Sequence, residues 1–395
     1  MKVLHLLYQS LPNISGSSVR SRSIINAQKT IGLSPIVITS PFQSGVKVNH
    51  GWEELDQIRY YRCYIDQASF RLGSKKNFFI RIMKFMTLFK YFVTVYKIAR
   101  DENADLIHSH AMFYNALPGI IAAKLLRIPH VYEIRSDWAQ NSHFKSSVFV
   151  RKLMSSLEKL CVRLSSGLVV ISQGLMTLYG GYTKKSILIG NAVDDDLLDS
   201  QKDTHIKSLS LPIHIGYIGS VIPLEGIEYI LKALKNFDES QIIFTVAGGG
   251  ESLALLKELK EQYGFSDNYV RFIGKVAHGK IPSIYKEIDV IINYRRDEPV
   301  AHSVTPLKPL EAMAYKKLVI VSDVRGMTEL VSHMSNGIVV KSDCPSELVK
   351  LFQSIIENPK FYIQLRINGY EFVSKKKSWN QNAKKYQLFY EDLLG

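Results

Sequence analysis

The sequence predicts an α/β fold built from two doubly wound parallel sheets, and three observations support this. Short apolar, β-branched runs alternate with longer helical patterns along the whole chain. The runs are continuously apolar, which is typical of parallel strands that are covered on both faces. The 395 residues are enough for two domains of ordinary size.

The first half contains five expected strands separated by long helical patterns. The expected strands are Val3–Tyr8, Pro35–Thr39, Leu106–Ser109, Val131–Ile134 and Gly167–Ile171. The expected helices are Ser18–Ile31, Asn77–Arg100, Tyr114–Leu126 and Ser146–Leu164. The polar, acidic stretch 194–210 is expected to link this half to the next.

The second half repeats the alternation. Its expected strands are His214–Ile218, Ile242–Ala247, Val270–Ile273, Val290–Asn293, Val319–Ser322 and Gly337–Val340. Its expected helices are Gly226–Asn236, Ser252–Tyr263, Ile281–Glu287, Leu307–Tyr315, Pro345–Glu357 and Phe361–Val373. In paired α/β domains ligands bind at the carboxyl ends of the strands, so we expect the site in a cleft between the two domains.

Composition and termini exclude several classes of protein. The three cysteines are far apart and form no CxxC pair, which argues against a structural zinc site and a disulfide framework. The first residues do not resemble a signal peptide, and no window is apolar enough for a membrane span. We therefore expect a cytoplasmic protein.

The positive charge is concentrated in the first half. Residues 1–190 carry a net charge of +15, whereas the remainder carries −1. The segment 71–100 has eight basic residues, no acidic residue and many apolar ones. This pattern is typical of a basic amphipathic helix on an anionic membrane surface, but also of a helix that packs one face on a sheet. No signature of nucleic-acid binding accompanies the charge, so we expect no nucleic-acid partner.

Motifs for other nucleotide chemistry are missing. No G-x-G-x-x-G follows the first strand and no Walker A loop occurs, which disfavours hydride transfer and ATP hydrolysis. The triplet 248–250 follows an expected strand but is weak evidence alone.

The stretch 293–329 carries the strongest chemical pattern. Thr305 is expected to cap a helix with Pro306 in its first turn, and the free N–H groups there suit a phosphate. Lys308 adds a positive charge, and Glu311 can accept hydrogen bonds from a vicinal diol such as ribose. The alternative for Lys308 and Glu311 is a surface ion pair.

At this point the sequence resembles a known family. PLKPLEAMAYKKLVIVSDVRGMTELV (306–331) is similar to the signature of family 4 glycosyltransferases, which have the GT-B fold. Further segments match in order and spacing: 105–110, 128–135, 189–194, 215–220, 244–251 and 270–276. The resemblance implies two Rossmann-like domains facing across a cleft and a final helix that crosses back to the first domain. The expected boundaries are 1–195, 196–375 and 376–395.

The resemblance implies a retaining transfer of a sugar from a nucleoside diphosphate sugar, without a metal or other cofactor. The C-terminal domain would bind the donor through Gly219, Ser220, Gly248, Lys275, Val276, Arg295, Thr305, Pro306, Leu307 and Glu311. The N-terminal domain would bind the acceptor through Gly16, Ser17 and Arg20. Lys308, Arg135 and His110 are the candidate catalytic residues, with a buried structural role as the alternative for His110.

The sequence departs from the family pattern in three features. Ser303 stands where the family usually has the first glutamate of its Glu-x7-Glu motif, and Glu298 or His302 are the candidates to replace it. Gly219-Ser220…Glu225-Gly226 stands in place of Gly-Arg…Lys-Gly, so both usual diphosphate-binding cations are missing. Lys308, Arg295 or Arg296 would then have to meet that charge. Arg135 takes the place of a histidine found in many members.

These observations favour a transferase that uses a UDP sugar and a glycan or lipid-linked acceptor in capsule, O-antigen or exopolysaccharide synthesis. The basic first half favours an anionic or membrane-bound acceptor and peripheral attachment to the inner face of the membrane. Two alternatives remain. One is a catalytically silent subunit of a polysaccharide or glycosylation complex, and the other is a nucleotide-sugar epimerase.

Overall fold

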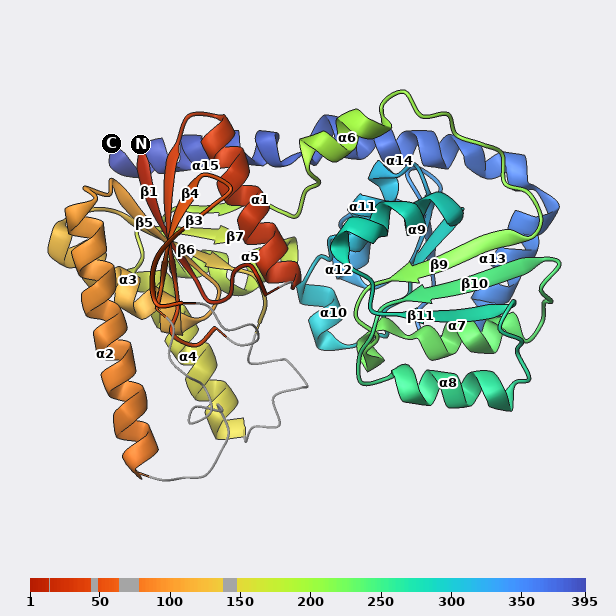
Figure 1. Ribbon diagram of the computed structural model, residues 1–395, viewed down its shortest axis with the longest axis horizontal. Coiled ribbons are helices and arrows are strands. Elements are labelled where there is room, and N and C mark those ends of the chain that lie inside the picture. Colours follow the sequence, from red (N-terminus) through yellow and green to blue (C-terminus); the bar gives the residue numbers. More distant parts are fainter. Residues whose placement is uncertain (14, 44–48, 64–77, 138–147) are drawn as a thin grey trace. The chain divides into compact units, whose positions relative to one another are not determined.

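The computed structural model divides the chain into two compact units, which we describe separately (Figure 1). The first unit comprises Met1–Gly190 and Trp379–Gly395, and the second comprises Asn191–Ser378. The structure describes residues 1–13, 15–43, 49–63, 78–137 and 148–395, without the side chains of 78–84 and 278. Of the basic segment 71–100, residues 71–77 therefore lie outside the described part.

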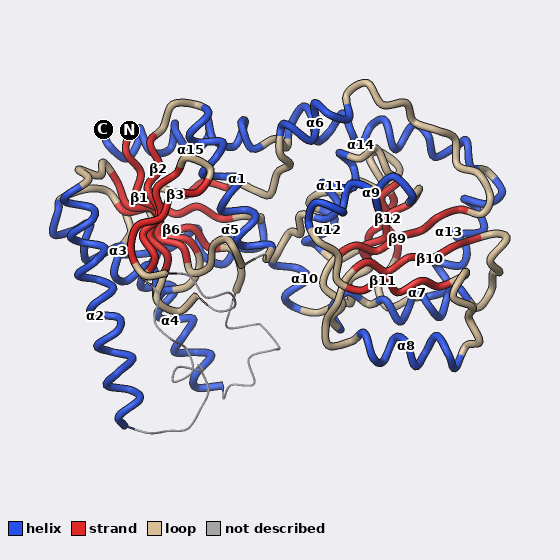
Figure 2. Tube along the Cα trace, in the orientation of Figure 1, coloured by secondary structure: helices blue, strands red, loops and turns tan. Residues whose placement is uncertain are grey.

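The first unit is built on an eight-stranded sheet with the order β3-β4-β2-β1-β5-β6-β7-β8. The strands gather in the middle of the unit, with helices around them (Figure 2). Its strands are β1 (Lys2–Leu7), β2 (Ser34–Thr39), β3 (Gly51–Leu55), β4 (Ile58–Arg62), β5 (Leu106–His110), β6 (His130–Ile134), β7 (Gly167–Val170) and β8 (Ser186–Leu188). All neighbouring strands pair in parallel except β3, which is antiparallel to β4. The expectation of a wholly parallel sheet is therefore wrong at this edge, where a short turn joins the two strands.

The two faces of the first sheet have different chemistry. Its helices are α1 (Gly16–Thr30), α2 (Phe78–Asp101), α3 (Phe113–Leu126), α4 (Val148–Leu164), α5 (Gln173–Tyr179) and α15 (Trp379–Leu394). The face under α2 and α3 is mainly apolar and includes Leu4, Leu6 and Ile107, with Ser109 and His130 as buried polar side chains beneath α3. On the other face α1 and α15 pack against each other, and polar side chains fill the layer beneath them.

The second unit has a six-stranded parallel sheet with the order β11-β10-β9-β12-β13-β14. Its strands are β9 (Ile213–Ile218), β10 (Ile242–Ala247), β11 (Val270–Gly274), β12 (Val290–Asn293), β13 (Leu318–Ser322) and β14 (Ile338–Val340). Its α-helices are α6 (Asp195–Gln201), α7 (Ile227–Leu234), α8 (Leu253–Gln262), α9 (Ile281–Glu287), α10 (Pro299–Ser303), α11 (Lys308–Ala314), α12 (Arg325–Thr328), α13 (Pro345–Glu357) and α14 (Ile363–Lys376).

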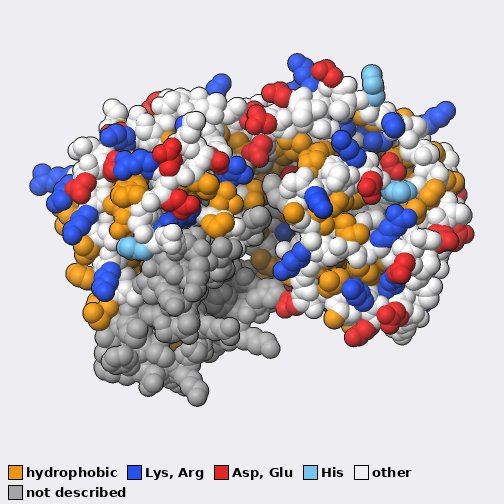
Figure 3. All heavy atoms as spheres, viewed as in Figure 1, with side chains coloured by type: hydrophobic (Ala, Val, Ile, Leu, Met, Phe, Trp, Pro, Cys, Tyr) orange, Lys and Arg blue, Asp and Glu red, His pale blue; other side chains and the backbone are white. Residues whose placement is uncertain are grey.

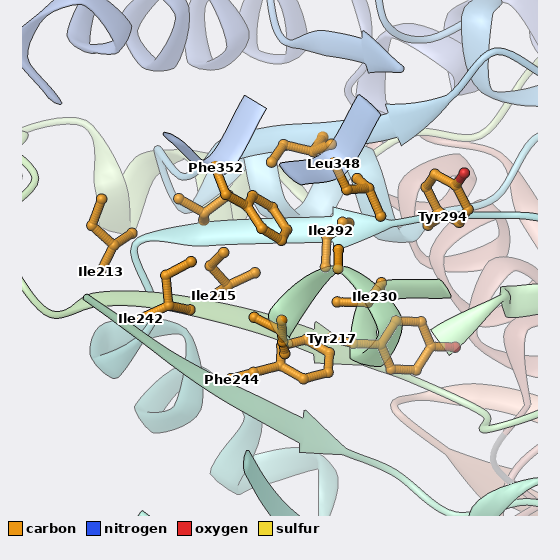
Figure 4. Packing of buried hydrophobic residues seen from close by; sticks show 14 of the residues in the cluster. Ile213, Ile215, Tyr217, Ile230, Ile242, Phe244, Ile292, Tyr294, Leu348 and Phe352 are labelled. Atoms are coloured by element: carbon orange, nitrogen blue, oxygen red, sulfur yellow. The ribbon is translucent and has the colours of Figure 1, made fainter. Parts of the chain in front are cut away.

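Both faces of the second sheet bury apolar side chains, as continuous apolar strands require. On one face, Ile215, Phe244 and Ile292 from three strands pack against Ile230 of α7 and Phe352 of α13 (Figure 4). The opposite face packs against α9, α11 and α12. These two layers hold the carboxyl ends of the strands in fixed positions.

The predicted fold class is confirmed, with local differences. Every predicted strand and helix is present within a few residues. The short elements β3, β4, β8, α5, α6, α10 and α12 are present in addition to the predicted ones. The predicted linker contains α6, which forms because Leu198 packs into the core of the second unit.

Helices α2, α3 and α4 expose apolar side chains together with basic ones. Phe85, Phe89 and Phe149 are 72%, 58% and 75% exposed. Figure 3 shows hydrophobic and basic side chains close together along the left edge of the first unit. In these three helices the acidic residues are Asp101 and Glu158, and Glu158 is buried. No helix among the described residues is long and apolar enough to span a bilayer.

Candidate functional site

The second sheet places two loops at a topological switch point. β9 and β12 are neighbours in the sheet, although β9 continues through α7 to β10 on one side and β12 continues to β13 on the other. At such a point the loops that follow the two strands diverge and leave room for a ligand. Gly219 follows β9, and Arg295 follows β12 after one residue.

Glycines let three segments approach closely at this point. A Cβ atom on Gly248 would lie 1.7 Å from the carbonyl oxygen of Gly219, and Gly248 has φ +158. A Cβ atom on Gly219, which has φ +150, would lie 2.4 Å from Cε of Lys308. The Lys308 side chain therefore lies directly against the backbone of the loop after β9.

Buried Glu225 and Arg295 form a charge cluster with half-buried Lys308, which we call the charge triad. Lys308 Nζ lies 2.8 Å from Glu225 Oε2 and donates to the Tyr217 hydroxyl at 2.6 Å. Arg295 Nε lies 3.4 Å from Glu225 Oε1, and its NH1 donates to the carbonyl oxygen of Val304 at 3.2 Å. The triad combines two cations with one carboxylate, so it carries one net positive charge.

The protonation states follow from burial and pairing. Burial alone would raise the pKa of Glu225, but Lys308 and Arg295 outweigh it and hold that pKa below its ordinary value. Burial lowers the pKa of Lys308, and the attraction of Glu225 offsets only part of this effect. Glu225 is therefore an anion in the folded protein, and Lys308 is a cation that gives up its proton more readily than an exposed lysine.

Glu311 lies one turn after Lys308 on α11. Burial, followed by repulsion from Asp194, raises the pKa of its carboxyl group to about 7. A carboxyl group with this pKa changes its protonation state near neutral pH. A partner that needs the carboxylate form will therefore bind more weakly below pH 7, by about 1.4 kcal/mol for each pH unit.

The expected helix start at Thr305 is wrong. α11 begins at Lys308 after Leu307, and no side chain caps it. The carbonyl oxygens of Val304 and Thr305 accept hydrogen bonds from Arg295 and from Asn191 Nδ2, the latter at 2.7 Å. These bonds hold the segment in an extended conformation, which the proline at 306 also favours in the residue before it.

The other predicted residues of the second unit lie around the triad or on its rim. Ser220 is exposed, and its carbonyl oxygen accepts a hydrogen bond from Tyr217 at 2.6 Å. Lys275 is exposed and extends over Gly249, while Val276 packs on the core. Pro306 is buried and Leu307 half-buried beside the triad.

The structure also gives the contacts of residues at or near the positions that depart from the family pattern. Ser303 is buried, and its hydroxyl donates to the Val300 carbonyl at 3.2 Å. His302 pairs with Asp297 at 2.5 Å, and Arg296 lies 3.8 Å from Glu228.

The first unit contains a ring of polar side chains beneath α1 and α15, joined by hydrogen bonds except between His108 and Glu133. His110 Nδ1 lies 2.7 Å from Arg135, and His110 Nε2 lies 2.8 Å from His5 Nδ1. Further hydrogen bonds link His5 to Gln28, Gln28 to Tyr390 and Tyr390 to His108 Nδ1, at 2.8, 3.0 and 2.7 Å. His108 Nε2 lies 3.7 Å from Glu133, which in turn binds Arg135. We call these seven residues the polar ring: His5, Gln28, His108, His110, Glu133, Arg135 and Tyr390.

The ring fixes the tautomer of each histidine. Arginine only donates, so His110 Nδ1 accepts and His110 Nε2 carries the hydrogen. His5 Nδ1 then accepts, and its Nε2 donates to the Gln28 oxygen. The Gln28 amide donates to Tyr390, whose hydroxyl donates to His108 Nδ1.

The nitrogen atoms of His5, His108 and His110 lie within 4.8 Å of one another, which is close enough to suggest a metal site. In the ring, however, all three lone pairs accept hydrogen bonds. Burial, the largest effect, also lowers the pKa of each imidazole, that of His110 to about 4, so all three are neutral. The arrangement therefore fits a hydrogen-bonded core network better than a metal centre.

Glu133 is the central anion of this layer. Burial alone would raise its pKa, but Arg20 and Arg135 hold it well below its ordinary value. Arg20 also donates to the carbonyl oxygens of Ile189 and Gly190 at 2.8 and 3.0 Å. Arg135 donates to Ser17 and to Ser21 on the first turns of α1. Tyr386 of α15 donates to Glu133 as well.

The structure therefore brings three predicted site residues together in the interior of the first unit. Arg20, His110 and Arg135 are at most 7% exposed, whereas Gly16 and Ser17 lie on the surface at the start of α1. This geometry favours the structural alternative for His110 and makes Arg135 a residue that positions the start of α1.

Sequence reasoning missed Glu133, Tyr386, His5 and Gln28. The available signal was the presence of His5, His108 and Glu133 inside otherwise apolar strands.

Comparison with known proteins identifies the family of the chain. A family model described as "Glycosyl transferases group 1" matches residues 202–372, and one described as "Glycosyltransferase Family 4" matches residues 56–197. The chain belongs to the family 4 glycosyltransferases. It is thus an enzyme of a retaining family that transfers a sugar from a nucleotide sugar.

Individual relatives are distant but cover most of the chain. An uncharacterized glycosyltransferase of Methanocaldococcus jannaschii is 24% identical over 86% of this chain and 92% of its own. The UDP-Gal:alpha-D-GlcNAc-diphosphoundecaprenol alpha-1,3-galactosyltransferase of Escherichia coli is 24% identical over 72% of this chain and 76% of its own. The structure of Anabaena HepE in complex with UDP has a TM-score of 0.70 at 16% identity and covers 99% of this chain and 100% of its own. It shares the fold.

Proposed function

We propose that this glycosyltransferase uses a UDP sugar as donor and a lipid-linked or anionic glycan as acceptor in the synthesis of a cell-surface polysaccharide. The second unit would bind the donor and the first unit the acceptor. The observation that carries the donor assignment is the charge triad at the switch point of the second sheet, with Glu311 one turn away on α11.

The triad suits the chemistry of the leaving group. As the bond to the sugar breaks, negative charge grows on the diphosphate, and fixed cations aimed at that charge are usually the largest catalytic contribution. Lys308 and Arg295 would supply these cations, so we propose that no metal ion is needed. Glu311 as a carboxylate would bind two hydroxyl groups of the ribose. Gly219 and Gly248 let the loops after β9 and β10 and the Lys308 side chain pack closely together, which fixes the position of this cation.

Two observations support a membrane-bound acceptor. The E. coli relative is named for an acceptor that carries a diphosphoundecaprenol group. Helices α2, α3 and α4 expose apolar and basic side chains, a combination that binds anionic lipid surfaces. We propose that this surface holds the enzyme peripherally on the cytoplasmic face of a membrane.

A thermal-shift panel of UDP, GDP, ADP, dTDP and their common sugar derivatives tests the donor assignment. A ligand at 100 times its Kd stabilises a fold by about 2.7 kcal/mol. We expect a response to UDP and UDP sugars, lost in Lys308→Ala and weakened in Glu311→Ala. A response to another nucleoside diphosphate would change the donor, and silence across the panel would overturn the donor site. UDP binding without turnover on any acceptor would favour the silent-subunit alternative.

A further inference from the structure

The charge triad raises a question that the proposed function leaves open. The family usually places a lysine where this chain has Glu225, so a carboxylate stands inside a site that should receive an anion. Glu225 is 4% exposed and lies within 3.5 Å of both nearby cations. A carboxylate in this position repels a diphosphate, so its presence in the site calls for a role other than direct contact with the ligand.

We infer that Glu225 is a positioning residue of the donor-phosphate subsite: its carboxylate holds Lys308 and Arg295 in the ligand-free protein, and these cations pass to the diphosphate when the donor binds. This inference rests on the proposed function. In the ligand-free protein, Glu225 would supply the negative charge that the diphosphate supplies when the donor is bound.

The contacts of Arg295 support an exchange. Arg295 is 9% exposed, and its contacts to Glu225 are long, at 3.4 and 3.5 Å. Its Nε has no hydrogen-bond partner among the described residues. Leaving a buried charged donor incompletely bonded is costly, so a stronger anion would be accepted readily.

The position of Lys308 supports it as well. The Lys308 side chain is 21% exposed, whereas that of Glu225 is 5% exposed. A ligand from solvent can therefore reach the lysine without displacing Glu225. The Tyr217 hydroxyl, 2.6 Å from Lys308 Nζ, would keep the ammonium group in place during the exchange.

The exchange makes an unusual prediction for Glu225→Gln. Removing one partner of a buried ion pair destabilises a protein because the remaining charge is uncompensated. In this variant the diphosphate would supply the missing compensation and would no longer compete with a carboxylate. We therefore expect a lower Tm for the ligand-free variant but tighter binding of UDP, by roughly tenfold, within the usual range of coupling between sites.

Calorimetric titration of UDP and of uridine at pH 7 into the wild type, Glu225→Gln and Glu228→Gln tests this. Glu228 is the matched control because it lies near the next arginine along the chain, 3.8 Å from Arg296, outside the triad. We expect tighter UDP binding only in Glu225→Gln and no change for uridine, which has no phosphate. A residue with a merely structural role would weaken UDP binding or leave it unchanged when removed.

The outcomes separate the two claims. If the wild type does not bind UDP, the proposed donor fails. If it does, and Glu225→Gln binds UDP no more tightly, the inference about Glu225 is overturned. Should the variant be too unstable for calorimetry, its Tm at saturating UDP decides. If saturating UDP raises the Tm of Glu225→Gln to that of the UDP-bound wild type, the exchange is supported. If the Tm of the variant stays as far below the wild-type Tm as it is without UDP, the exchange is contradicted.

Discussion

Tyr386 of the C-terminal helix α15 donates its hydroxyl hydrogen to Glu133 on β6, 253 residues earlier in the chain. The same carboxylate binds Arg20 of α1 and Arg135, which follows β6. One buried anion thus joins α15 to α1 and to the end of β6 within the first unit. The specificity of this layer comes from polar pairing, because most of its buried donors and acceptors are satisfied only in this one arrangement.

Glu133→Gln should destabilise the first unit strongly. The substitution leaves two buried arginines without their anion, and breaking a buried pair in this way typically costs about 3–5 kcal/mol. Urea unfolding followed by circular dichroism would measure the loss. Glu371→Gln is the control, because Glu371 forms an exposed pair with Lys375 that should contribute less than about 1 kcal/mol. Equal effects in the two variants would contradict the central position of Glu133.

Lys308→Ala should lower turnover far more than it alters the fold. Loss of one fixed donor to a developing charge typically costs about 10²-fold or more in turnover. A radioactive sugar-transfer assay with membrane extracts as acceptor would measure it. Lys257→Ala, which removes an exposed lysine on α8, should retain wild-type activity. Because Lys308→Ala leaves Glu225 with only its longer contacts to Arg295, Lys308→Ala/Glu225→Gln should restore stability but not activity. Normal turnover in either variant would remove Lys308 from the mechanism.

The architecture could be predicted from the sequence because it depends on local patterns. Continuous apolar runs such as Ile242–Ala247 have no alternative to burial, and their alternation with helices implies parallel sheets. The short hairpin of β3 and β4 was not predicted because its strands mix charged and aromatic residues and lack a continuous apolar run. Helix α6 was not predicted because its acidic residues are typical of a linker, although Leu198 packs into the core.

The site could be predicted only in part. Local motif and helical spacing pointed to Lys308 and Glu311. The role of Glu225 depends on Arg295, 70 residues away, and Tyr386 meets Glu133 only after the chain has crossed the second unit. Pairings over such distances are set by tertiary structure, which no local pattern records. For the same reason, Arg135 looked like a free cation at a strand end.

Phe89→Asp should weaken attachment to anionic membranes. Phe89 is 58% exposed on α2, and its transfer to lipid would contribute roughly 2 kcal/mol, or more than tenfold in affinity. The added negative charge also opposes anionic headgroups. Co-sedimentation with vesicles that contain phosphatidylglycerol, at low salt, would measure the change. Leu255→Asp, at a 54% exposed leucine on α8, should bind like the wild type. Undiminished binding of Phe89→Asp would exclude α2 from the membrane surface.

Glu311→Gln should bind UDP more weakly and make the ligand-free protein more stable at neutral pH. Burial, together with Asp194, raises the Glu311 pKa to about 7, above its value of about 4.3 in an unfolded chain. The folded state therefore holds the proton more strongly, and wild-type stability decreases as the pH rises from about 4.3 to about 7. Glutamine cannot ionise, so the stability advantage of the variant should be absent near pH 4 and complete above pH 7. Thermal unfolding across this range would measure it. If the carboxylate binds ribose, the ratio of the wild-type affinity for UDP to that of Glu311→Gln should rise through pH 7, because ionisation of the UDP phosphate affects both proteins and cancels in this ratio. A Glu311→Gln affinity equal to that of the wild type at pH 8 would exclude ribose binding by this residue.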